Sequence, residues 1–366
     1  MTRSTAHAQA GFTLVELMVA LAIGVFMIGA VISVYIAQSQ TYKGSNSQAA
    51  VQTAENAIAA MIVPAVRGAG FAGCGTVAGA VSNLVAGGPP PLGNLGAGAT
   101  MVQGYDYTGT AGAGSALTIT ADNPANDTNA AHWSPTLDAT LAGQVLPGSD
   151  VLVVLGPVPG SLPSGVTAVT SGSDSVTVAS TSAFPTNGQL AAVSDCLKTS
   201  IFQVTSTTAT TLKHLVGAAP LTNASTLLSV NYPVGAQVVP MQQTAFFVGH
   251  GPAGQSTLMR ATLDGTNGAS WNAPVEALVP GVETMQVLYG IGSGGVTTQY
   301  VAASAVTDWS AVYSVRLAFL IEGQTGANQG GLATAPVLLG TTVTPPADSV
   351  LRHAYEITIS LRNATP

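Results

Sequence analysis

A single carboxylate, Glu16, stands inside an otherwise uncharged apolar run at residues 12–37. A carboxylate within a membrane-spanning segment costs about 2.5 to 3.5 kcal/mol at the bilayer centre, and less near an end. As a helix the run would be about 39 Å long, against roughly 30 Å of hydrocarbon in a bilayer. The run can therefore span a membrane, and we expect Glu16 to need a compensating contact.

A short polar leader that ends at Gly11 precedes the apolar run. A secretory signal peptide places its apolar stretch before the cleavage site, and this run is too long for such a stretch. The natural cut lies before the run, so the run is retained. Cleavage after Gly11 would free an α-amine on Phe12, with an ordinary pKa of about 7.7 to 8, one helical turn from Glu16.

That amine and the Glu16 carboxylate would make an assembly contact if several such helices packed side by side. The amine of one subunit would then meet the carboxylate of its neighbour. The alternative is an ordinary signal-anchor helix in which Glu16 reaches into the head-group region. Composition alone does not separate these two interpretations.

The segment AGFTLVELMVALAIG, residues 10–24, resembles the leader and N-methylation motif of type IV prepilins and type II secretion pseudopilins. The resemblance implies that a prepilin peptidase cleaves between Gly11 and Phe12. It also implies that Phe12 becomes N-methylated and that Glu16 is the acidic fifth residue of the mature chain. The protein is then the substrate of that enzyme.

Beyond the apolar run the sequence turns polar but keeps small or apolar residues at roughly helical spacing. They are Ala50, Ala54, Ala57, Ile58, Met61, Ile62 and Ala65. Pro64 and the glycines that follow it end this pattern. We therefore predict one helix over about residues 13–66, with two helices joined near Lys43 and Gly44 as the alternative.

After residue 75 short apolar runs alternate with Gly, Pro, Ser and Thr, which indicates strands separated by turns. The predicted strands are residues 116–120, 150–156, 175–180, 189–196, 237–241, 244–249, 256–263, 283–290, 314–323 and 355–363. Residues 81–99 are rich in Gly and Pro, and we predict a long surface loop there. The fold class is thus α+β, with a long N-terminal helix packed on a mainly β head.

Five further segments resemble PilW-type minor pilins of the type IV pilus, in the order and at the spacing of that family. They are residues 66–74, 193–196, 279–291, 315–323 and 355–363. The resemblance implies a pilin-like fold and a structural role in priming pilus assembly, at the fibre tip. It also implies that the partners are the prepilin peptidase, other minor pilins, the major pilin and, before assembly, inner-membrane lipid.

These patterns divide the chain into four predicted parts. They are the prepilin leader peptide (1–11), the transmembrane half of the helix (12–37), its amphipathic half (38–67) and the exported head (68–366). A single-pass inner-membrane location with an exported head, followed by entry into the pilus, is the localisation that this organisation implies.

The only two cysteines, Cys74 and Cys196, would lie in the exported head, where the compartment is oxidising. A bridge that closes so long a loop could stabilise the fold by roughly 5 kcal/mol in the chain-entropy treatment. It would tie the end of the long helix to the middle of the head. Two separate buried thiols are the alternative.

Other chemistry is poorly supported by the sequence. Only 7% of the residues are charged, the net charge is −7, and the nine basic residues are scattered, so direct nucleic-acid binding is not expected. Asp122, Asn126, Asp127 and Asn129 share a polar loop but lack the ordered spacing of a calcium-binding loop. We therefore expect no metal, no cofactor and no catalytic residues.

Three alternatives to a minor pilin remain open at this stage. A type II secretion pseudopilin would share the N-terminal motif but not the PilW-like segments. An adhesin or binding module displayed at the tip would use residues 81–135 as its contact surface. A membrane-anchored exported enzyme would need a nucleophile, a base and an oxyanion-stabilising group, and no such set is recognisable.

Overall fold

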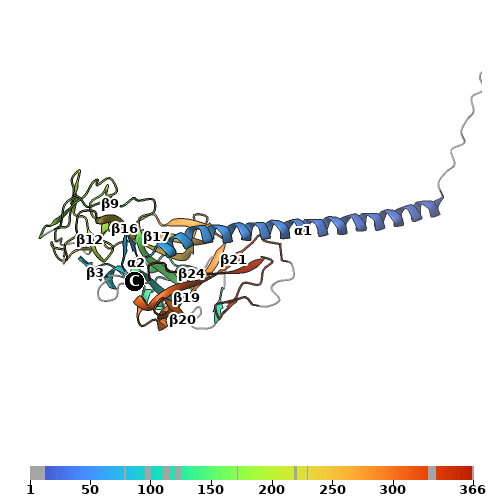
Figure 1. Cartoon of the computed structure of the whole chain (residues 1–366). Helices are drawn as coiled ribbons and strands as arrows, with labels where there is room; N and C mark the ends of the chain where they lie inside the picture. Colours follow the sequence, from blue (N-terminus) through green and yellow to red (C-terminus); the bar gives the residue numbers. More distant parts are fainter. Residues whose placement is uncertain are drawn as a thin grey trace, which may run out of the picture.

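The computed structural model consists of one long helix and a β-rich head (Figure 1). It describes residues 13–77, 80–94, 100–109, 116–119, 125–170, 172–217, 221–228, 230–328 and 335–364. Helix α1 (Leu14–Gly68) is continuous for 55 residues, with Pro64 inside its last turns. The prediction of a single helix is confirmed, and the alternative of a break near Lys43 and Gly44 is wrong.

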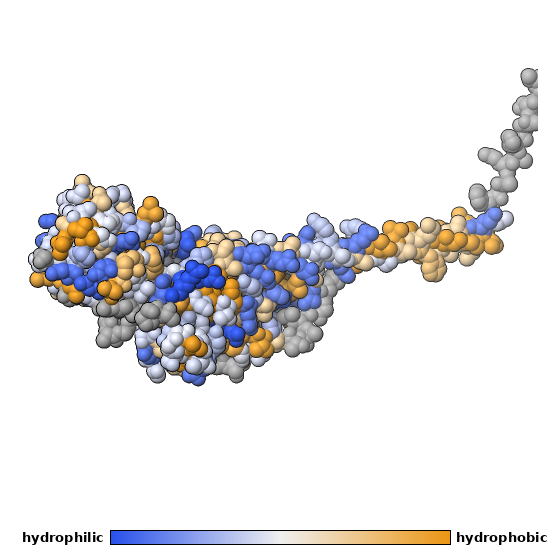
Figure 2. Space-filling model, in the orientation of Figure 1, coloured by the Kyte–Doolittle hydropathy of each residue, from blue (hydrophilic) through white to orange (hydrophobic). Residues whose placement is uncertain are grey.

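The two halves of α1 have different surroundings. The N-terminal half projects away from the head and presents apolar side chains on its surface (Figures 1 and 2). The C-terminal half packs on the head through a line of side chains spaced four or seven residues apart. The buried residues of this line are Ser47, Val51, Ile58, Ile62 and Val66.

The predicted apolar stripe of α1 is only partly right. Ile58 and Ile62 are buried as expected, but Ala50 and Met61 are exposed. The orientation of the helix is set by its larger β-branched side chains, because they remove more apolar surface from water than alanine does.

The larger sheet is organised around one long strand, β16 (Gln237–His250). The first part of β16 pairs with β11 on one side and β9 on the other. Its later part pairs with β17 and β8. The sheet contains β3 (Ala80–Asn83), β5 (Val102–Tyr107), β7 (Trp133–Ser134), β8 (Val151–Pro157), β9 (Ser164–Gly165), β11 (Leu190–Ser194), β12 (Lys198–Gln203), β17 (Ser256–Leu263) and β18 (Glu276–Pro280).

A second sheet is antiparallel throughout and has the order β20, β19, β21, β24. Its strands are β19 (Val282–Ser293), β20 (Val296–Val301), β21 (Val312–Glu322) and β24 (Arg352–Ser360). Helix α1 contacts both sheets, through β24 and β21 of this one and through β18 and β8 of the larger one. The helix therefore serves as a shared support for the two sheets.

The remaining elements are short. Four small sheets are formed by β1 (Phe71–Ala72) with β2 (Gly75–Thr76), β4 (Val85–Ala86) with β15 (Thr222–Asn223), β10 (Ser175–Thr177) with β14 (Thr211–Lys213) and β13 (Ser206–Thr207), and β22 (Val337–Leu338) with β23 (Thr341–Thr344) and β6 (Ala116–Thr118). The short helices are α2 (Ala139–Ala142), η1 (Leu92–Asn94), η2 (Ala130–His132), η3 (Ala303–Ala305) and η4 (Trp309–Ala311).

The head contains two large hydrophobic clusters. The first includes the buried face of α1 and the inner faces of both sheets. The second cluster includes Phe184, Phe202 and Tyr232. Most of its residues lie in the distal region, which we define as strands β9 to β15 (residues 164–223). Strands β9 and β12 lie at the end of the head far from the free end of α1 (Figure 1). The head is thus built as a helix-supported part and a distal extension.

The predicted strands agree with the structure in most places, with some corrections. Residues 237–241 and 244–249 belong to one strand, β16, and β5, β12 and β20 were not predicted. The predicted loop at 81–99 is wrong for its described part, which contains β3, β4 and η1. Strand β3 pairs in parallel with β12. Elements of two to four residues are too short to show a period, so tertiary pairing decides them.

Candidate functional site

The start of α1 is organised around Glu16. The Thr13 backbone N–H donates to Glu16 Oε2 at 3.1 Å, and the Glu16 N–H donates to Thr13 Oγ1 at 3.3 Å. This reciprocal pair is a capping box, which satisfies two backbone donors that the first helical turn leaves without partners. Glu16 is exposed, and Gly11 and Phe12 lie outside the described residues. The carboxylate is therefore held at the helix start and remains exposed.

The helix that follows Glu16 is suited to a membrane. The described chain has one helix, α1, that is long and apolar enough to span a bilayer, and its most apolar stretch has no buried residue. Phe26, Tyr35 and Leu14 are among its most exposed side chains. Apolar area of this extent on a helix without neighbours is stable only in lipid or against other helices.

A buried ion cluster joins β24 to β19 and to the segment that precedes β24. The Arg352 guanidinium donates to both Glu283 carboxylate oxygens at 2.8 to 2.9 Å and to both Asp348 oxygens at 2.6 to 2.8 Å. The Arg352 side chain is 2% exposed and the Glu283 side chain 6%. Hydrogen bonds from Arg352 lower the pKa of Asp348 below its usual value. The single Arg352 cation is thus shared between two carboxylates, one buried on Glu283 and one partly exposed on Asp348.

Two further contacts join α1 to the head. The backbone N–H of Gln324 donates to Ser47 Oγ at 2.9 Å, and Ser47 is fully buried. His353 Nε2 lies 3.2 Å from Glu55 Oε1 across the junction of α1 and β24. Sequence reasoning missed these contacts, because they join residues that are more than 250 positions apart.

A second buried carboxylate, Asp150, connects the two sheets. Its Oδ1 accepts from the Tyr107 N–H at 3.0 Å, and its Oδ2 accepts from the Val287 N–H at 2.8 Å. Burial, and to a lesser extent the charge of Asp106, raises the pKa of Asp150 well above its usual value. Both oxygens are occupied by backbone donors, so the arrangement is typical of a structural carboxyl group.

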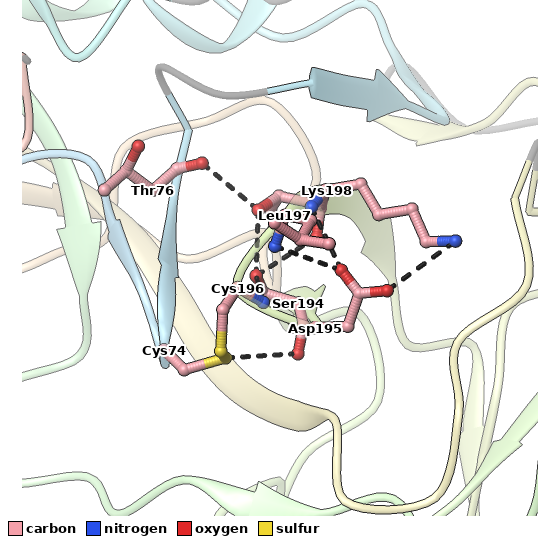
Figure 3. The surroundings of a disulfide bond; sticks show 8 residues. Cys74, Thr76, Ser194, Asp195, Cys196, Leu197 and Lys198 are labelled. Atoms are coloured by element: carbon pink, nitrogen blue, oxygen red, sulfur yellow. Dashed lines mark hydrogen bonds and ion pairs between the residues drawn. A yellow bond between two sulfur atoms is a disulfide. The ribbon is translucent and has the colours of Figure 1, made fainter. Parts of the chain in front are cut away.

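The predicted disulfide between Cys74 and Cys196 is present, and the alternative of two separate thiols is wrong. It joins the segment just after α1 to the turn between β11 and β12 (Figure 3). Asp195 accepts from the Leu197 and Lys198 N–H groups at 3.2 and 3.0 Å and fixes this turn. The bridge thus ties the distal region to the segment at the end of α1.

The polar loop at 125–132 is closed by its own side chains. Asp127 accepts from Tyr107 Oη at 2.8 Å and lies 2.6 Å from His132 Nδ1. Asn129 accepts from the Ala131 N–H, and Asp122 lies outside the described residues. No group of three or more His, Cys, Asp or Glu side chains that could hold a metal occurs in the described part of the chain.

Comparisons with known proteins match both ends of the chain. Residues 245–363 match the family model for type IV pilus-assembly protein W, and residues 6–32 match the prokaryotic N-terminal methylation motif. A type IV-like pilin from Thermus thermophilus is similar to 34% of this chain and 68% of its own, at 18% identity. The TM-score of 0.23 is too low to bear on the fold. No curated protein matches the chain.

Proposed function

We propose that this chain, a type IV pilin of the PilW family, is a minor pilin that helps to prime pilus assembly and is carried at the fibre tip. Its role is structural, and its partners are the other minor pilins and the major pilin. A prepilin peptidase would cleave it between Gly11 and Phe12 and methylate Phe12. Before assembly, the apolar half of α1 would be stored in the inner membrane.

The observation that carries this proposal is the free half of α1, with a single accessible carboxylate at its start. A helix that is unpacked in the monomer and apolar on all sides needs either lipid or a bundle of similar helices. Glu16 would gain a positive partner in such a bundle from the α-amine on Phe12 of a neighbouring subunit. The match at residues 245–363 favours the pilus over a secretion system.

Substitution of Glu16 tests the proposal. We expect Glu16→Ala to be processed normally but to enter fibres at least about tenfold less, because a lost charge pair in a dry helix bundle costs 1.4 kcal/mol or more. The matched control is Glu356→Ala, which removes an exposed carboxylate from β24. Quantitative blotting of membranes gives the extent of processing, and blotting of sheared fibres gives the amount of each variant that is incorporated. Normal incorporation of the Glu16 variant would contradict the assembly contact.

A further inference from the structure

The last two turns of α1 form an exposed ridge with a hollow on either side, and Pro64 and Gly68 line both hollows. The first hollow has a volume of about 480 Å³ and is mostly apolar. Met61, Pro157 and Phe246 contribute to its walls. The second hollow, of about 500 Å³, is lined by two arginines and an aromatic ring, namely Arg67, Arg362 and Phe71. We call the ridge with its two hollows the ridge surface.

The two arginines of the ridge surface come from distant parts of the chain, the last turn of α1 and the segment after β24. Both are exposed, and neither forms an ion pair with any residue that the structure describes. Lys198, Arg260 and Arg352 each pair with a carboxylate, whereas Lys43, Lys213 and Arg316 form no ion pair within the described part of the chain. The position of Arg67 in the last turn of α1 suits the helix dipole, but that argument does not account for Arg362.

An arginine pair beside an apolar hollow fits a particular kind of ligand. Guanidinium groups bind carboxylates through paired hydrogen bonds, and Met, Arg and aromatic residues are enriched at protein interfaces. Met61 and Phe71 are each 37% exposed, so their apolar surface is only partly covered. In a segment with an apolar side chain next to a carboxylate, the apolar side chain would fill the first hollow. The carboxylate would neutralise the positive charge of the arginines in the second hollow. Nucleic acid fits less well, because two cations on a chain of net charge −7 neutralise few phosphates.

The position of the ridge surface limits where the ligand can come from. Pro64 lies roughly 40 Å along α1 from the end of the apolar run at residue 37. A segment that reaches it must therefore be exported, and cannot be the membrane half of a neighbouring helix stored in the same bilayer. We propose that the ridge surface docks an acidic, exported segment of another pilin subunit. This inference rests on the proposed function, because it needs a second pilin beside this one.

Site-specific photo-crosslinking in cells that produce the full-length chain tests the proposal. A photoreactive residue at Met61 is expected to form an adduct with another pilin, whereas one at the exposed Val296 of β20 serves as the control position. Arg67→Glu combined with Arg362→Glu is expected to reduce the Met61 adduct at least about tenfold, because like charges at an interface rim oppose binding. Lys213→Glu, a charge reversal in the distal region, should leave it unchanged.

The outcomes separate this inference from the proposed function. If the chain enters fibres but Met61 crosslinks only to lipid, nucleic acid or no protein, the ridge surface is not a pilin docking site and the proposed function stands. If the adduct persists at full yield in the double arginine variant, the charge argument is wrong. Absence of the chain from fibres would overturn the proposed function itself. A disulfide assay on a non-reducing gel confirms that each variant is folded.

Discussion

The helix-supported core and the distal region are stabilised by different chemistry. Within the helix-supported part, we define the core as the packed half of α1 with β21 and β24, which contact it, and β19, which pairs with β21. The buried Arg352–Glu283 ion pair joins β24 to β19 in this core. The distal region has its own hydrophobic cluster and is tied to the end of α1 by the disulfide. The family match at residues 245–363 covers the three core strands, and the distal region lies outside it. The difference indicates a family scaffold to which a separately stabilised extension is fastened.

Removal of the disulfide is expected to cause the largest effect. The bridge spans a sequence separation of 122, so replacing Cys74 and Cys196 together by serine should lower the free energy of unfolding by up to about 5 kcal/mol. Urea unfolding of the full chain in detergent measures the loss. Hydrogen exchange then shows whether both regions or only the distal region are affected. An unchanged free energy would contradict the fastening role of the bridge.

Breaking the ion cluster should affect the core instead. Arg352→Met removes the cation that donates to both oxygens of the buried Glu283 carboxylate, and breaking such a buried pair typically costs about 3 to 5 kcal/mol. The matched control is Arg260→Met, which breaks the more exposed pair with Glu276 and should cost about 1 kcal/mol or less. Urea unfolding of the two variants compares their losses in the free energy of unfolding. Equal losses of unfolding free energy in the two variants would show that the buried cluster stabilises the protein no more than the exposed pair does.

Acidification is expected to give the smallest effect, with opposite signs in the two regions. Burial lowers the pKa of His214 in the distal region, so stability there is present above about pH 6.5 and is lost as the pH falls toward the folded value. Burial raises the pKa of Asp150 beside the core, so its contribution is full below about pH 3.9 and is lost as the pH rises.

Hydrogen exchange between pH 7 and 5, corrected for intrinsic rates, measures this contrast. Protection should fall in the distal region and hold or increase around Asp150. His214→Leu should flatten the first trend, and Asp150→Asn should flatten the second. Parallel trends in both regions would contradict the assignment of the two groups.

The sequence predicted the local features of this protein better than its long-range contacts. The extent of α1 follows from a continuous apolar run and a helical period, and the pairing of Cys74 with Cys196 follows from the lack of any other cysteine. The Arg352–Glu283 pair, in contrast, joins residues on different strands of the sheet. Single-sequence patterns carry no signal for such a pair. The exposure of Met61 was also missed, because the rotation of α1 depends on which residues the head covers.

The mass of the mature N-terminal peptide, determined by mass spectrometry on protein from native membranes and sheared fibres, tests the central claim most directly. We predict a chain that begins at N-methylated Phe12 and is found in both fractions. An intact Met1, or a cut after residue 37, would contradict the assignment of this protein as a processed pilin.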